Sequence, residues 1–88
     1  SLDEVAHIEL NEAFASQAIG CIEELGLDME RVNPNGGAIA LGHALGATGA
    51  VLTTKAAYAM KNAERKYAIV TMCVGGGEGS AAVFEKID

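Results

Sequence analysis

The chain has 88 residues, a formal net charge of −6 and a hydrophobic fraction of 50%, so it forms at most one small domain. The acidic balance excludes nucleic acid as a partner, because no basic patch is present to neutralise phosphates. The 2 cysteines lack the spacing of a disulfide framework or a zinc motif, and no apolar run is long enough to cross a membrane. We therefore expect a reducing compartment, the cytoplasm or, in a eukaryote, an organellar matrix, and neither a resident metal nor a membrane partner.

The first elements are a strand and a helix. Val5 to Leu10 alternates like a strand, with His7 expected on the strand surface. From Glu12 the period becomes helical, and Gly26 is a natural stop. One apolar face is predicted for this helix, and it comprises Phe14, Ala18, Ile22 and Leu25.

A turn, a second helix and a hairpin follow. Asn33–Pro34–Asn35–Gly36–Gly37 is the strongest turn signal, and Ala38 to Leu41 leads into a glycine-hinged loop ending at Gly46. The next helix is predicted to bury Leu52, Ala56, Ala59, Met60 and Ala63, and to turn Lys55, Tyr58, Lys61 and Asn62 away. Tyr67 to Cys73 is a buried-type strand, and Ala81 to Ile87 is its returning partner. This order predicts one layered α/β unit over residues 1–88, with a mixed sheet and two main helices.

Cys73 ends a predicted strand and enters the glycine run Gly75–Gly77, so its thiol is expected at the sheet edge where α/β proteins hold ligands. Glycines leave their peptide N–H groups open to a reacting oxygen, and the N–H of Gly75 is a candidate oxyanion donor. The alternative is a buried cysteine followed by an ordinary hairpin turn. For Cys21, on the flank of the first helix, packing is the favoured interpretation.

His43 stands among small residues just before a helix, where it suits a general base or an oxyanion donor because histidine changes charge near neutral pH. The alternative is a loop histidine satisfied by backbone groups. Asn11 suits binding of a water or a carbonyl group, but its structural interpretation is an N-cap of the first helix. The two histidines and two cysteines lack the local spacing of a zinc site, and the glycine runs match neither a dinucleotide nor a P-loop fingerprint.

Four linked segments together resemble the C-terminal signatures of the thiolase family, in the same order and with the same spacing. They are Asn11–Glu12–Ala13–Phe14–Ala15, Asn33-x-Asn35–Gly36–Gly37–Ala38–Ile39–Ala40–Leu41–Gly42–His43, Gly46–Ala47–Thr48–Gly49–Ala50 and Cys73-x-Gly75–Gly76–Gly77-x-Gly79. The resemblance implies a thiolase-like layered fold and acyl transfer between coenzyme A thioesters, which are substrates, with no resident cofactor. Thiolases cleave 3-oxoacyl-CoA with coenzyme A or run the reverse Claisen condensation.

The resemblance also implies a role for each site residue. His43 activates a nucleophilic cysteine and donates to a thioester oxygen, while Asn11 holds the water that is the companion donor. Cys73 moves the proton of the acetyl methyl group, and the Gly75 N–H serves the second oxyanion hole. A base close to a stabilised enolate oxygen is what formation of an α-carbanion requires.

Thiolases carry the acyl group on a cysteine of their N-terminal half, for which this sequence has no equivalent. We therefore expect the chain to be part of a larger enzyme, inactive without an N-terminal half, and a homo-oligomer (dimer or tetramer) by resemblance. The alternative function is a thiolase-like protein that binds acyl or lipid ligands without turnover. Three positions depart from the family pattern: Ala44 in place of proline, Val51 in place of arginine, and Glu78 in place of a neutral residue.

Overall fold

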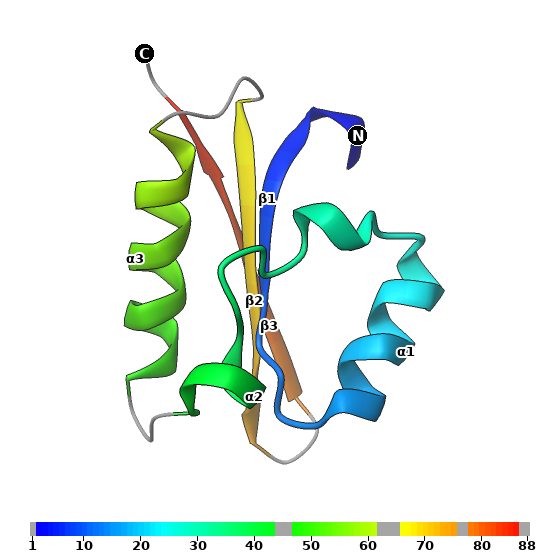
Figure 1. The fold of residues 1–88 in the computed structure, drawn as a ribbon. Helices are drawn as coiled ribbons and strands as arrows, with labels where there is room; N and C mark the ends of the chain where they lie inside the picture. The colour runs from blue at the N-terminus through cyan, green and yellow to red at the C-terminus, as the bar shows by residue number, and fades with distance from the viewer. Residues whose placement is uncertain (1, 44–46, 62–65, 76–77, 87–88) are drawn as a thin grey trace.

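A three-stranded mixed sheet lies at the centre of the protein, and the computed structural model describes residues 2–43, 47–61, 66–75 and 78–86. The strands β1 (Val5–Leu10), β2 (Tyr67–Gly75) and β3 (Glu78–Glu85) are ordered β1-β2-β3. β1 runs parallel to β2, and β3 is the antiparallel hairpin partner of β2. The helices α1 (Ala15–Leu25) and α3 (Thr48–Met60) lie on opposite sides of the sheet (Figure 1). The predicted α/β arrangement with two main helices is confirmed.

Short helices fill the connections. The 3₁₀ turns η1 (Leu2–Glu4) and η2 (Met29–Arg31) precede β1 and follow α1, respectively. The stretch expected only to lead into the glycine loop forms a helix of its own, α2 (Ala38–Leu41). Among the described residues, no helix has the length and apolar character needed to cross a membrane.

α3 packs on the sheet through small and unbranched side chains. Its buried residues Leu52, Ala56 and Met60 meet Ala68 and Val70 of β2. Ala56 and Ala68 are 2% and 0% exposed, so helix and strand approach closely where both side chains are single methyl groups. The predicted apolar stripe of α3 is confirmed at Leu52, Ala56 and Met60 but not at Ala59, which is only half-buried and lies outside this cluster. Ala63 and Asn62 lie outside the described residues.

The opposite face of the sheet forms a second core around Val5, Ile8, Leu10 and Ala18. The predicted apolar face of α1 is correct at Ala18 and Ile22 but wrong at its ends, because Phe14 and Leu25 are 73% and 61% exposed. The helix begins only at Ala15, and the backbone of Phe14 is extended. Gly26 ends the helix as predicted, in a left-handed conformation that folds Leu27 back onto the core in place of Leu25.

Polar residues on β1 pair beneath α3 and do not face solvent. His7 and Glu9 are 4% and 0% exposed, and their Nε2 and Oε2 atoms are 2.5 Å apart. Lys55 of α3 reaches the same carboxylate, with Nζ 3.4 Å from Oε1. The expectation that His7 lies on the surface and that Lys55 faces away is therefore wrong. From His7 to Leu10 the alternation separates two faces of β1, but α3 covers the polar face. His7 and Lys55 both pair with the Glu9 carboxylate there, although Glu9 Oε1 accepts no hydrogen bond from a described residue.

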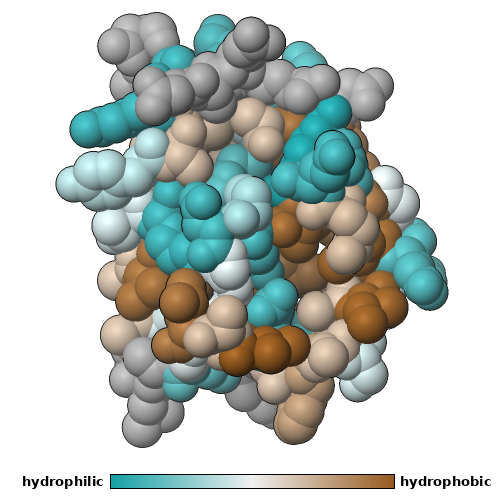
Figure 2. Space-filling model, viewed as in Figure 1, coloured by the Kyte–Doolittle hydropathy of each residue, from teal (hydrophilic) through white to brown (hydrophobic). Residues whose placement is uncertain are grey.

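Other apolar side chains remain uncovered. Every described side chain of β3 is exposed, including Val83 at 66% and Phe84 at 40%. Further exposed hydrophobic side chains belong to α2 and α1, among them Ile39, Leu41 and Ile19. Figure 2 shows hydrophobic surface on the face that these two helices share.

Candidate functional site

The candidate residues gather where the parallel strands β1 and β2 end, because parallel neighbours bring their carboxyl ends to one edge of the sheet. Leu10 pairs with Thr71, and the next residue, Asn11, donates its backbone N–H to the Thr71 carbonyl at 3.0 Å. Cys73 follows two residues later on β2. This edge lies at the lower end of the sheet in Figure 1, beside α2.

Asn11 meets His43 at this edge. Asn11 is 4% exposed, and its Nδ2 lies 3.4 Å from His43 Nε2. The N-cap interpretation of Asn11 is wrong, because α1 begins at Ala15 and its N-cap position is Phe14, without a side-chain hydrogen bond. The helix starts later than its hydrophobic period indicates, which leaves the amide of Asn11 available to the loop that carries His43.

The two ring nitrogens of His43 have different partners. An amide Nδ2 can only donate, so Nε2 of His43 accepts from Asn11 and carries the ring's lone pair. Nδ1 then holds the hydrogen and donates it to Thr48 Oγ1 at 2.6 Å. The imidazole itself is exposed, so a basic nitrogen is held in a fixed tautomer at an accessible position.

Two residues that the sequence did not single out by themselves hold this site in place. Thr48 begins α3 and fixes the ring of His43. Asn33 accepts from Leu10 N and donates to Leu10 O, one residue before Asn11. Both residues stand in the family-like motifs, and Asn33 also lies in a predicted turn, where its positive φ of 46° fits asparagine. Neither motif indicated these contacts, because each contact depends on how distant parts of the chain fold back.

Cys73 and Gly75 are placed through their backbones. Cys73 pairs with Gly79 and Gly75 with Glu78, with an irregular register between the two pairs. Ala44, Gly76, Gly77, and the side chains of Cys73 and Glu78, lie outside the described residues. Cys21 packs against the α1 core, as predicted, and its Sγ accepts a hydrogen bond from Gln17.

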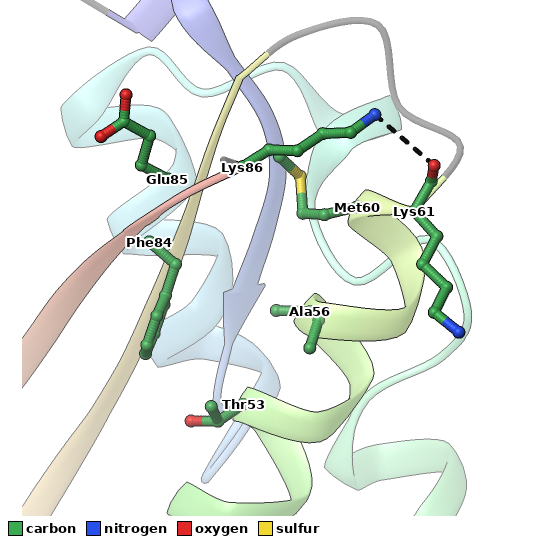
Figure 3. A pocket seen from close by; sticks show the side chains of 8 residues that line it. Thr53, Ala56, Met60, Lys61, Phe84, Glu85 and Lys86 are labelled. Atoms are coloured by element: carbon green, nitrogen blue, oxygen red, sulfur yellow. Dashed lines mark hydrogen bonds between the residues drawn. The ribbon is translucent and has the colours of Figure 1, made fainter. Parts of the chain in front are cut away.

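Two hollows differ in their relation to these residues. A small one of about 30 Å³ is lined by Asn11, Gly42, Thr48 and Val51 among others, and is large enough for one water. A surface groove of about 550 Å³ lies between α3 and β3, lined by Ala56, Met60 and Phe84, with Lys86 Nζ bonded to the Lys61 carbonyl at its end (Figure 3). Neither Asn11 nor His43, the candidate residues whose side chains the structure describes, lines the larger groove. Within the described part of the chain, no group of three His, Cys, Asp or Glu residues is arranged to hold a metal.

The chain is similar to known proteins over nearly its whole length. A family profile described as "Thiolase, C-terminal domain" matches residues 1–86. The 3-ketoacyl-CoA thiolase of Bacillus subtilis (strain 168) is 58% identical over 84 residues, which are 96% of this chain and 22% of that protein. A beta-ketothiolase of Cupriavidus necator is 56% identical over 80 residues, covering 91% of this chain and 20% of the relative.

Solved structures give the same result. Human mitochondrial 3-ketoacyl-CoA thiolase, with and without CoA, superposes with a TM-score of 0.93 at 40% identity. The match covers 99% of this chain and 22% of the human one, so the chain spans about a fifth of the length of the thiolases it matches. The chain belongs to the thiolase family and corresponds to its C-terminal domain.

Proposed function

We propose that this chain is the C-terminal catalytic segment of an acyltransferase that cleaves 3-oxoacyl-CoA with coenzyme A or runs the reverse Claisen condensation of acetyl-CoA. The observation that carries the proposal is the contact between Asn11 and His43 at the sheet edge where β2 also brings the Cys73 backbone. A protein that only binds acyl groups has no need for an amide, a basic imidazole and a thiol at one edge.

His43 and Asn11 serve the first part of this reaction. The lone pair on His43 Nε2 accepts the proton of a nucleophilic thiol, and the resulting thiolate attacks the acyl-CoA. The bond from the acyl group to the sulfur of coenzyme A breaks, and the departing coenzyme A thiolate takes the proton of the Cys73 thiol, which leaves Cys73 as a thiolate. The protonated Nε2 then donates a hydrogen bond to the thioester oxygen of the second substrate. Asn11 holds a water as the companion donor, and the small hollow beside its amide has room for one.

Cys73 and Gly75 serve the carbon–carbon bond. In condensation the Cys73 thiolate removes a proton from the acetyl methyl group, and the resulting carbanion attacks the acyl-enzyme carbonyl. The Gly75 N–H stabilises the oxyanion formed there, and the nucleophilic cysteine leaves as a thiolate. Thiolysis is the same sequence in reverse, with Cys73 returning the proton to the departing acetyl carbanion.

The nucleophile and most of the CoA surface have to come from chain beyond these 88 residues. The thiolases that match are about five times longer, and a solved complex of the human enzyme contains CoA. The exposed apolar residues of β3 and the groove beside them suit burial against further protein. We accordingly propose that the chain acts with a thiolase N-terminal half, in a homo-oligomer, and that residues 1–88 alone are inactive.

The test uses a joined polypeptide, in which this chain replaces the corresponding C-terminal segment of the Bacillus subtilis 3-ketoacyl-CoA thiolase. Thiolysis of acetoacetyl-CoA is measured for residues 1–88 alone and for the joined polypeptide. The proposal expects activity only in the joined polypeptide. A joined polypeptide that is folded by circular dichroism and binds CoA, yet shows no thiolysis, would overturn it and favour the acyl-binding alternative.

A further inference from the structure

The side chain of Glu12 reaches the start of a helix in another segment. Its Oε1 accepts a hydrogen bond from the backbone N–H of Ile39, the second residue of α2, at 3.2 Å. The N-cap position of α2 is Gly37, which has no side chain to supply such an oxygen. Glu12, two residues after the end of β1, therefore provides the hydrogen-bond acceptor that a serine or aspartate at the N-cap position ordinarily provides. Its negative charge also suits the positive end of a helix.

Gly37 gives independent support for this contact. A Cβ built on Gly37 comes within 3.0 Å of Glu12 Oε1 and also of Asn33 Nδ2. The backbone of Gly37, at φ −117° and ψ −159°, is open to any residue, so space and not conformation is what requires glycine. The carboxylate of Glu12 thus occupies the volume that any other residue at position 37 would fill.

Glu12 and its neighbour Asn11 hold the two ends of the same short element. Glu12 bonds the N-terminus of α2, while Asn11 contacts His43, which follows the C-terminus of α2 after Gly42. The apolar side chains of α2 anchor it little among the described residues, because Ile39 and Leu41 are 65% and 66% exposed. Polar contacts therefore set the position of α2 along the sheet edge.

We propose that Glu12 is a positioning residue for His43: by capping α2 it fixes where the imidazole stands relative to the Asn11 amide. The positioning role itself is argued from the contacts of α2. Its expected effect on the rate rests on the proposed function. Displacement of a reacting group by about 1 Å costs as much as 10²-fold in rate, so a loosened α2 lowers kcat more than it alters KM.

The test compares Glu12→Ala and Glu12→Gln in the joined polypeptide, with Glu23→Ala on the exposed side of α1 as a matched control. Glu12→Ala is expected to lower kcat for acetoacetyl-CoA thiolysis by about 10- to 100-fold with KM unchanged. Glu12→Gln keeps an oxygen acceptor and is expected to restore most of kcat, while Glu23→Ala matches the parent. An unchanged kcat in Glu12→Ala, or no recovery in Glu12→Gln, would overturn the proposal.

Gly37→Ala provides a second route to the same displacement. Because its methyl group and the Glu12 carboxylate compete for one volume, Gly37→Ala is expected to lower kcat as Glu12→Ala does. The double variant is expected to lose less than the product of the two single losses, although the methyl group still meets Asn33 Nδ2. Fully multiplied losses would contradict a shared mechanism. This arm also replaces Glu12→Ala if that variant does not fold.

A crystal structure of the joined polypeptide carrying Glu12→Ala tests this proposal independently of the proposed function, because the structure can be determined even if the polypeptide is inactive. The proposal expects α2 to move and the contact between Asn11 Nδ2 and His43 Nε2 to be lost. Retention of the parent separation would overturn it. An inactive parent whose Glu12→Ala variant loses the contact would refute the proposed function alone.

Discussion

Asn33 forms two hydrogen bonds with the backbone of Leu10. Leu10 N donates to its Oδ1 at 2.9 Å, and its Nδ2 donates to Leu10 O at 2.7 Å. Its own backbone N–H donates to Ile8 O at 2.8 Å. The side chain thus pairs with the end of β1 as a neighbouring strand would, which ties the loop before α2 to the residue preceding Asn11.

Replacing Asn33 by alanine removes both side-chain bonds from a half-buried position. We expect Asn33→Ala to lower the free energy of unfolding by about 1–3 kcal/mol, since Leu10 N and O lose their partners. Urea denaturation of the joined polypeptide measures this, with the exposed Asn35→Ala as control. Equal midpoints for the two variants would contradict the prediction.

The buried and exposed ion pairs of this chain are expected to differ sharply in their contribution to stability. Lys55→Met leaves the fully buried Glu9 without its cation, and removal of one partner of a buried pair costs about 3–5 kcal/mol. Lys66→Met breaks the exposed pair with Glu85, which is worth about 0–1 kcal/mol. Denaturation midpoints of both variants test the difference, and adding Glu9→Gln to Lys55→Met should recover part of the loss.

The contact of Thr48 with His43 predicts a kinetic effect. Thr48→Val keeps the shape of the buried side chain but removes the oxygen that accepts from Nδ1, so the ring loses its fixed tautomer and orientation. We expect kcat for thiolysis to fall by about 10-fold or more, as when a histidine loses the partner of its second nitrogen. Thr48→Ser should remain close to the parent, and a Val variant as fast as the Ser variant would contradict the assignment.

The proposed division of roles predicts that loss of His43 slows both half-reactions, whereas loss of Cys73 acts mainly on condensation. His43→Ala should slow both acylation and condensation by about 10²–10⁴-fold, because one imidazole serves both steps. Cys73→Ser should remove condensation while sparing some acylation. Trapping of the acyl-enzyme followed by single-turnover condensation separates the steps, and normal condensation by Cys73→Ser would refute its role.

Much of the fold could be predicted from local patterns. The strand Val5–Leu10, the stop at Gly26 and the stripe of α3 each follow from period and from glycine chemistry within one segment. The burial of His7 could not, because it depends on α3, more than forty residues away, covering the polar face of β1. Phe14 shows the opposite error: it was predicted to be on the apolar face of the helix, but it is exposed. The helical period of the sequence begins before Ala15, where the backbone becomes helical.

For the candidate site, the sequence indicated the residues but not the contacts that hold them in place. The motifs named Asn11 and His43, and the structure brings them together, but it does so through contacts that cross the chain. Glu12 with Ile39 and Asn33 with Leu10 join residues more than twenty positions apart. No periodicity in one sequence reveals such pairs, because each joins one polar side chain to backbone groups of a distant residue.

The parallel pairing of β1 with β2 affects the order in which the parts of the candidate site are synthesised and assembled. β1 ends at Leu10, its partner begins only at Tyr67, and everything between is the crossover that holds His43. Closing such a long loop lowers the conformational entropy of the chain before the stabilising contacts between β1 and β2 can form, so the step is slow. Asn11 therefore emerges from the ribosome long before the strand that brings Cys73 beside it. We accordingly expect this edge to assemble late in folding. A chain shortened before β2 carries Asn11 and His43 but lacks both Cys73 and the strand that pairs with β1.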